Sequence, residues 1–330
     1  MRKKISLCIF TLVGVYMFPL SLLAQSYAEE KKSKVQVSFT PFLSTNGLHS
    51  CDYSNNVSFN ILVGVSKNEE FFTFAGLANI VRNEAKGLQF AGLANYVGNK
   101  GNGMQFAGIT NISKNHYNGF QFAGLANIAG NIKGFQLGGI INIAKDVNGV
   151  QLAGLVNIAE NSDYPIGIVN IIKNGEKSIS LTYNDLGSTM ISFRSGGKVT
   201  YGIVGIGYNH KTSGRSYVTE AGLGAHINCL SWFRINNELK AACFGYSNNP
   251  FTIDNDDHLK NTVFNISFCI QPGIRISPHL ELFAGPSISY INAGDAENKL
   301  IPKHPIWKRL GSSRDQYIHI GYQVGIQYIF

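Results

Sequence analysis

The sequence predicts an all-β chain that forms a transmembrane antiparallel β-barrel of about 16 strands. Three observations predict this fold class: a repeat of about 15 residues at 71–172, a last strand that alternates apolar and polar residues, and connections that alternate in length. The alternative is a β-solenoid repeat region fused to a smaller barrel. The repeat by itself fits both architectures.

The chain begins with the features of a secretory signal peptide. Three basic residues at 2–4 precede an apolar run at 5–23 and then small residues. This order predicts a signal peptide at residues 1–24, with cleavage after Ala28 as the alternative. We expect an N-terminal tail at 25–34 and a single barrel domain at 35–330, with the repeat strands at 71–172. No later stretch approaches the ~18 apolar residues of a spanning helix.

The repeat has the form Gly, aliphatic residue, any residue, Asn. Its seven glycines are 16, 16, 16, 15, 15 and 13 residues apart, at Gly76, Gly92, Gly108, Gly124, Gly139, Gly154 and Gly167. Five copies carry a Gln three residues before the Gly, at Gln89, Gln105, Gln121, Gln136 and Gln151. Because strand side chains alternate, these Gln and Asn residues share one face and the apolar residues share the other.

Three architectures could use this unit. A helix would carry an interior Gly in every copy, at about 1 kcal/mol each, and would lack regular caps. In a solenoid the phenylalanines would fill the core and the amides would stack in ladders. In a barrel each copy would be one strand of the ~9–11 residues that cross a bilayer, with the amides toward the lumen.

The second half of the chain favours the barrel. In the last strand Ile318, Ile320 and Tyr322 alternate with His319, Gly321 and Gln323, and the chain ends at Phe330. The connections at 195–197, 228–231 and 277–279 are short, whereas those at 209–216, 245–262 and 292–316 are longer. Short periplasmic turns and longer external loops are typical of outer-membrane barrels. The aromatic C-terminus resembles the terminal signal of these barrels, which implies the barrel insertion machinery as a partner during assembly.

The phrase Gly-Leu-x-Asn-Ile-Ala, preceded by Gly-x-Gln, resembles the surface-repeat proteins of Gram-negative bacteria. The resemblance covers residues 71–172, about a third of the chain. It implies an outer-membrane or surface location and brings no catalytic residues.

Composition excludes several classes of function. The net charge of +8 becomes 8 − 3 = +5 after the predicted cleavage, which is too mild to indicate nucleic-acid binding. Catalytic, metal-binding and cofactor-binding motifs are absent from the sequence, so we expect no enzyme activity and no cofactor. Four cysteines would remain, Cys51, Cys229, Cys243 and Cys269, and their spacing leaves disulfide pairing open.

Charged residues on the polar faces of the later strands are expected to point into the lumen. A charge on the lipid face at mid-membrane would cost about 2–4 kcal/mol. The lumenal candidates are Glu220, His226, Arg234, Glu238, Lys240, Arg275, Glu281 and His319. We interpret them either as a salt-bridge network that stiffens the wall or as a selectivity or substrate site.

The loop at 292–316 gives a second candidate site. Lys303, Lys308 and Arg309 surround Trp307 there. Such a basic segment is expected either to be simply solvated or to meet lipopolysaccharide or a host surface ligand. We therefore predict an integral outer-membrane protein with a structural or surface-binding role, surrounded by outer-membrane lipid. The alternative is a passive, porin-like channel.

Overall fold

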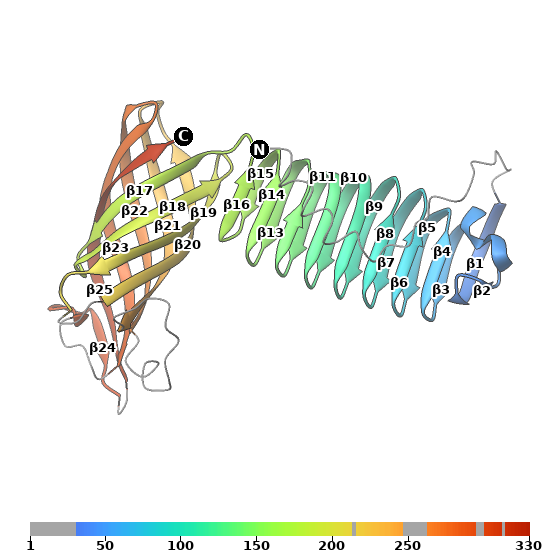
Figure 1. Ribbon diagram of the computed structural model, residues 1–330, viewed down its shortest axis with the longest axis horizontal. Helices are drawn as coiled ribbons and strands as arrows, with labels where there is room; N and C mark the ends of the chain where they lie inside the picture. The colour runs from blue at the N-terminus through green and yellow to red at the C-terminus, as the bar shows by residue number, and fades with distance from the viewer. Residues whose placement is uncertain (1–30, 213–215, 247–262, 295–299, 312–313) are drawn as a thin grey trace. The chain divides into compact units, whose positions relative to one another are not determined.

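The computed structural model describes residues 31–330 except 213–215, 247–262, 295–299 and 312–313 (Figure 1). The predicted signal peptide lies outside the described residues. Two separate hydrogen-bonded sheets account for almost all of the described chain. The first is a parallel β-solenoid built from the repeats, and the second is a closed antiparallel barrel.

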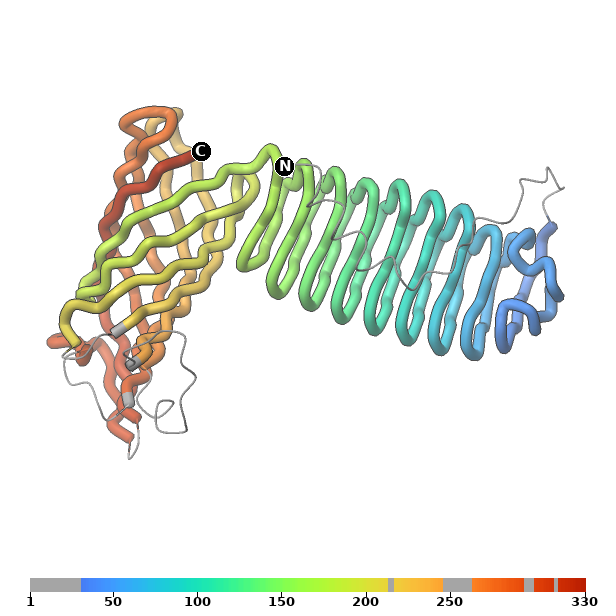
Figure 2. Tube along the Cα trace, in the orientation of Figure 1, coloured from blue at the N-terminus to red at the C-terminus, as the bar shows by residue number. Residues whose placement is uncertain are grey.

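Each coil of the solenoid contains two strands separated by a bend, and equivalent strands of successive coils pair in parallel (Figure 2). The longer strands form one row: β3 (Tyr53–Asn60), β5 (Asn68–Ala75), β7 (Glu84–Ala91), β9 (Lys100–Ala107), the later parts of β10 (Thr110–Ala123) and β11 (Ala126–Gly138), β13 (Asp146–Ala153) and β15 (Asn161–Ile166). The shorter strands form the other: β4 (Val63–Ser66), β6 (Ala78–Val81), β8 (Ala94–Val97), the first parts of β10 and β11, β12 (Ile141–Ile143), β14 (Val156–Ala159) and β16 (Val169–Ile172).

An N-terminal segment precedes these coils. Strand β1 (Lys31–Thr40) pairs with β3 and with the short β2 (Leu43–Ser44), and a 3₁₀ helix η1 (Gly47–Asp52) follows. The tail expected at 25–34 therefore overlaps the first four residues of a strand.

The solenoid interior is lined by amides. Asn79, Asn95 and Asn111 are fully buried, and each donates from Nδ2 to the Oδ1 of the next Asn at 2.9, 3.0 and 2.9 Å. This asparagine ladder continues through Asn127, Asn142 and Asn157 to Asn170. The glutamine ladder, Gln89 to Gln151, donates the other way, from each Gln to the one before it. Within each ladder, every inner amide both donates to one neighbour and accepts from the other, so buried polar groups inside the stack find partners. At the two ends of the glutamine ladder, Gln89 Nε2 and Gln151 Oε1 have no hydrogen-bond partner.

The glycines of the repeat are required by the closeness of successive coils. A Cβ at Gly92 would lie 2.0 Å from the carbonyl oxygen of Gly76, and one at Gly124 would lie 2.2 Å from that of Gly108. The second glycine, two residues before each Gln, has a positive φ, for example 129° at Gly119. Glycine is the residue that adopts this conformation without steric cost.

The barrel contains eight strands in sequence order and closes by pairing its first strand with its last. They are β17 (Lys177–Asn184), β18 (Ser188–Gly196), β19 (Thr200–Asn209), β20 (Ser216–Asn228), β21 (Phe233–Tyr246), β22 (Val263–Ser277), β23 (Leu280–Gly294) and β25 (Arg314–Ile329). A short ninth strand, β24 (Trp307–Arg309), pairs with β25 next to the closure.

The structure confirms part of the predicted fold and contradicts the rest. The all-β prediction and the antiparallel barrel are confirmed, in the form of the alternative: a solenoid repeat region fused to a smaller barrel. The count of about 16 strands in one barrel domain at 35–330 is wrong, because the repeat strands pair in parallel with their own kind instead of joining the barrel wall. The expectation that phenylalanines would fill a solenoid core is also wrong. Phe90, Phe106 and Phe122 stack on the outer face, with ring centroids 4.9 and 5.0 Å apart.

Candidate functional site

The barrel interior gathers the charged residues of the second half of the chain. Along β20 and β21 the side chains alternate, so that Glu220, Glu238 and Lys240 are buried while Leu223 and Leu239 are exposed on the outer face. An eight-stranded barrel has an interior just wide enough to be filled by side chains. The polar residues of opposite walls therefore meet.

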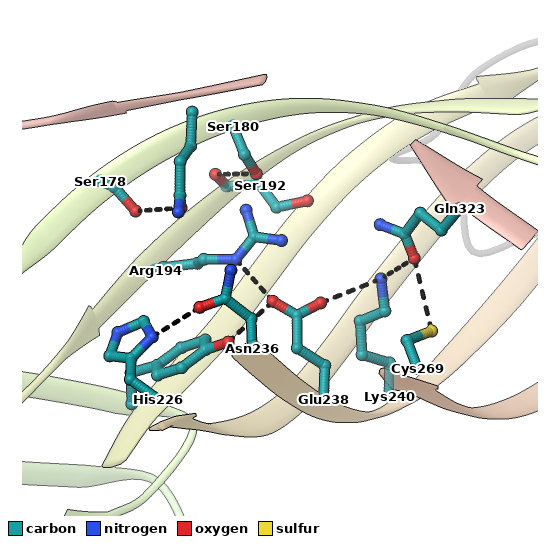
Figure 3. A network of polar contacts seen from close by, with 12 residues as sticks. Ser178, Ser180, Ser192, Arg194, His226, Asn236, Glu238, Lys240, Cys269 and Gln323 are labelled. Atoms are coloured by element: carbon teal, nitrogen blue, oxygen red, sulfur yellow. Dashed lines mark hydrogen bonds and ion pairs between the residues drawn. The ribbon is translucent and has the colours of Figure 1, made fainter. Parts of the chain in front are cut away.

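One cluster centres on Glu238 (Figure 3). Arg194 Nε lies 2.8 Å from Oε1 of Glu238, and the Tyr201 hydroxyl donates to the same oxygen at 3.0 Å. Lys240 Nζ lies 3.5 Å from Glu238 Oε2 and 3.6 Å from Glu220 Oε2. Lys240 also donates to Gln323 Oε1 of β25 at 2.6 Å, which joins facing parts of the wall.

A second cluster lies toward the end of the barrel where β17 begins. Arg234 contacts Glu176 at 2.8 Å and Glu281 at 2.7 Å. Arg275 contacts the same two carboxylates at 3.1 and 3.5 Å. His226 lies 3.5 Å from Glu176 through Nε2 and pairs with Asn236 through Nδ1 at 2.8 Å.

The two clusters balance in charge. Their cations are Arg194, Arg234, Lys240 and Arg275, and their carboxylates are Glu176, Glu220, Glu238 and Glu281. Removing one partner of a buried pair leaves an uncompensated charge and typically costs about 3–5 kcal/mol. Each charge of these clusters therefore depends on its partners, and the paired side chains lie in the barrel interior.

A third contact lies away from these clusters. His319 Nε2 is 2.9 Å from Asp185 Oδ2, and the Asp185 backbone N–H donates to the Tyr322 carbonyl at 3.1 Å. Asp185 follows the end of β17, so its contacts tie the β17–β18 turn to β25.

All eight lumenal candidates from the sequence lie on the inner face of the barrel. Glu281 is fully buried, whereas the Arg275 side chain is the most open of the set at 30 % exposure. Sequence reasoning missed Arg194, Tyr201, Glu176 and Asp185. Arg194 was detectable, since it continues the inward alternation of Met190 and Ser192 along β18. Glu176 and Asp185 lie outside the strands, where alternation gives no signal.

The external-loop candidates are also at the surface. Lys303, Trp307, Lys308 and Arg309 are all exposed, Trp307 by 43 %. Part of this segment is strand β24, where Lys308 is paired with Tyr317 of β25. The predicted loop at 292–316 thus contains an ordered strand beside the barrel wall.

The described residues contain little else that indicates chemistry. No group of three or more His, Cys, Asp or Glu residues there could hold a metal ion. Cys51, Cys229, Cys243 and Cys269 are free thiols. In the part of the chain that the structure describes, no helix is long and apolar enough to cross a membrane.

Comparisons with known proteins give fold-level similarity only. No family model matches the sequence, and no curated protein matches it. The N-terminal β-barrel domain of Pseudomonas aeruginosa OprF is 10 % identical and has a TM-score of 0.31, with 48 % of this chain and 98 % of that chain covered. The Yersinia pestis outer membrane protein Ail is 11 % identical and has a TM-score of 0.27, with 48 % of this chain and 100 % of that chain covered. Neisserial surface protein A is 14 % identical and has a TM-score of 0.27, with 47 % of this chain and 94 % of that chain covered.

Proposed function

We propose that this chain is an integral outer-membrane protein whose barrel anchors the solenoid and conducts no solutes. The outer face of the barrel supports the membrane location, because it is apolar on every side. Ile191, Ile266 and Ile320 are 58, 49 and 64 % exposed, and other exposed outward residues include Leu181, Ile206, Leu239, Ile274, Leu282, Ile288 and Val324. An outward apolar band around a polar interior is the pattern of membrane barrels.

Connection lengths support an orientation with the C-terminus in the periplasm. The turns at 197–199, 229–232 and 278–279 are short and lie at the same end as the C-terminus, where the Phe330 N–H donates to the Lys177 carbonyl. The longest connections, 247–262 and 295–313, leave the opposite end. Longer loops are typical of the external side. Tyr328 and Phe330 are 50 and 64 % exposed at this end of the barrel.

The structural role rests on one observation, the charge-balanced network that fills the lumen. Arg194, Glu238 and Lys240 are each at most 4 % exposed. A water-filled pore needs solvated lumenal charges, and an eight-stranded barrel leaves no room for it once these side chains are in place. We thus favour an anchor without catalytic activity over the porin-like channel.

Planar-bilayer conductance tests this role. The folded full-length protein is expected to give no stepwise current. A matched positive control is the quadruple variant Arg194→Ala, Glu220→Ala, Glu238→Ala and Lys240→Ala, which removes two cations and two carboxylates and so preserves the net charge. We expect small conductance steps from that variant. Stepwise current from the unaltered protein would reject the anchor in favour of the channel.

We further propose that the exposed basic segment binds an anionic surface ligand such as lipopolysaccharide. Lys308 and Arg309 directly follow Trp307 in β24, which pairs with β25 of the proposed membrane barrel, and the exposed Lys303 precedes Trp307 by four residues. The test is binding of purified lipopolysaccharide to the triple variant Lys303→Glu, Lys308→Glu and Arg309→Glu. We expect at least tenfold weaker binding, and weaker binding at higher salt.

The control carries the same change in net charge at a different place. Lys100, Lys114 and Lys133 are exposed on the solenoid, and their triple change to Glu is expected to leave lipopolysaccharide binding within twofold of the original. Equal losses in both triple variants would mean that only net charge matters, and would reject a site at 303–309.

A further inference from the structure

The outer surface of the solenoid has an apolar edge. At each Gly-Leu bend an aliphatic side chain points outward: Leu77, Leu93, Ile109, Leu125, Ile140 and Leu155, which are 39, 43, 42, 44, 44 and 49 % exposed. One such residue occurs per coil, so the row runs along six coils. The register that stacks the coils keeps these side chains in line.

The apolar surface continues from this edge onto both sheets. On the longer strands Phe90, Phe106 and Phe122 face outward. Two residues before each of them, and so further from the bend, the next outward side chains are Leu88, Met104 and Phe120. On the shorter strands Ile80, Tyr96 and Ile112 face outward. The apolar band therefore wraps around the edge and covers both flanks.

All charged side chains of these coils lie at the other edge. Within residues 76–172 they are Arg82, Glu84, Lys86, Lys100, Lys114, Lys133, Lys145, Asp146, Glu160 and Asp163. Each lies between the end of a shorter strand and the early residues of the longer strand that follows. We call this side the polar edge. A solenoid surrounded by water on all sides is not expected to carry one continuous apolar surface opposite a charged edge, because large exposed apolar patches mark sites of interaction.

The depth of the apolar band matches one lipid leaflet. In the coil that bends at Ile109, Met104 is the outward apolar residue furthest from the bend, and the next outward residue is the exposed Asn102. The five steps from Met104 through the end of β9 at Ala107 to Ile109 in the bend span at most about 16 Å at ~3.3 Å per residue. Half of a ~30 Å hydrocarbon core is about 15 Å.

We propose that the apolar edge of the solenoid inserts into the periplasmic phospholipid leaflet of the membrane that holds the barrel. This inference rests on the proposed membrane barrel. Only residues 173–176 separate β16 from β17, and β17 begins at the end of the barrel with the short turns. Fluid lipid chains can cover a convex edge and both of its flanks at once. A second copy of the chain or another protein would cover one flank. The amide-filled interior stays dry and the polar edge meets the headgroups.

Quenching by brominated lipids tests the inference on the full chain. Trp232 and Trp307 are first changed to Phe, and the protein is reconstituted in phosphatidylcholine vesicles with brominated acyl chains. A single tryptophan is then introduced by Leu125→Trp or Leu93→Trp at the apolar edge. Lys133→Trp is the control at the polar edge, in the coil that bends at Ile140 and adjoins the coil that bends at Leu125. Ile266→Trp on the outer face of the barrel reports whether the barrel is in the membrane.

We expect brominated chains to quench the Leu125→Trp and Leu93→Trp variants at least twofold more than Lys133→Trp. Quenching of Ile266→Trp without quenching of the two apolar-edge variants would overturn the inference and leave the membrane barrel standing. Absence of quenching in Ile266→Trp as well would overturn both. Apolar-edge variants that escape lipid quenching yet are shielded from aqueous acrylamide would show a protein partner there, and would also reject lipid insertion.

Discussion

At the scale of single residues, the interior of the solenoid depends on continuous amide ladders. Gln121 donates to Gln105 Oε1 at 2.7 Å and accepts from Gln136 Nε2 at 2.9 Å. Both neighbours are fully buried. A break in the ladder therefore leaves polar groups without partners in a place that water does not reach.

Gln121→Leu is expected to lower the local free energy of unfolding by about 2–4 kcal/mol, at ~1–3 kcal/mol for each buried polar group affected. Gln136 Nε2 loses its acceptor, and Gln105 Oε1 keeps only the longer hydrogen bond from the Ser113 hydroxyl at 3.4 Å. Amide hydrogen exchange of the reconstituted full chain over residues 105–140 measures this loss. The control Asn118→Leu changes an exposed outward residue on the same strand and should stay within about 0.5 kcal/mol. Equal protection in Gln121→Leu and the original protein would mean that the ladder contributes nothing.

Glu69 makes the first coils sensitive to pH. It is 2 % exposed and accepts from the Ser58 hydroxyl at 2.7 Å and from Asn55 Nδ2 at 3.1 Å. Burial raises the pKa of Glu69 to about 7 from its usual 4.5, although these hydrogen bonds act to lower it. Since the folded state holds the proton more tightly than the unfolded chain, stability is highest below pH 4.5 and falls until the pH passes about 7.

The expected loss between pH 4.5 and 8 is up to about 3 kcal/mol in the local stability of residues 54–75. Hydrogen exchange at several pH values, corrected for the intrinsic exchange rate, measures it. Glu69→Gln should remove this dependence, whereas Glu70→Gln should keep it, because Glu70 is partly exposed and paired with Lys86 at 2.8 Å. A pH profile that survives in Glu69→Gln would assign the effect to another group.

At the scale of elements, the spacing of the coils is set by glycine. Gly124→Ala would place a methyl group 2.2 Å from the Gly108 carbonyl oxygen, and the adjacent coils cannot stay paired at that distance. We expect a loss of roughly 3 kcal/mol or more in the protection of the neighbouring coils, at the upper end of single-substitution effects. Gly245→Ala in β21 is the matched control, since its added Cβ would have its nearest neighbour at 3.9 Å. Hydrogen exchange at 105–140 that is unchanged in Gly124→Ala would contradict the steric argument.

The alternation of residues predicted part of this architecture. It identified one amide face and one apolar face in each repeat, and the amides do lie inside with the phenylalanines outside. Alternation does not report whether neighbouring strands run parallel or antiparallel, because both give a period of two. The residues that distinguish parallel stacking are the two glycines carried by five of the seven copies: Gly119, for example, has a positive φ, and Gly124 lies against the previous coil. Those contacts exist only when equivalent residues stack.

The later strands were easier to predict because their partners are close in sequence. Each barrel strand pairs with the next across a turn, so alternation and connection length together define the wall. Strands β17 and β18, of 8 and 9 residues, both form part of the wall. Contacts made by residues outside strands could not be foreseen, as with Glu176 bridging Arg234 and Arg275.

At the scale of the whole molecule, the described residues form two sheets that share no strand. The solenoid is stabilised by amide ladders and close stacking of coils. The barrel is stabilised by closure between β17 and β25, where Leu181 is paired with Ile326, and by its interior charges. Damage to one sheet should therefore leave the other intact.

Leu181→Pro tests this independence, because proline within a paired strand removes a ladder hydrogen bond at the closure. We expect loss of the heat-modifiable gel migration that marks a closed barrel, while hydrogen-exchange protection of the solenoid at 76–160 stays unchanged. Gly124→Ala should give the reverse result, with solenoid protection lost and heat-modifiable migration kept. Leu181→Ile keeps the apolar outward side chain and the backbone N–H, and should behave as the original. Loss of both properties in either single variant would mean that the solenoid and the barrel fold as one cooperative unit, since a lesion in one sheet would then have propagated to the other.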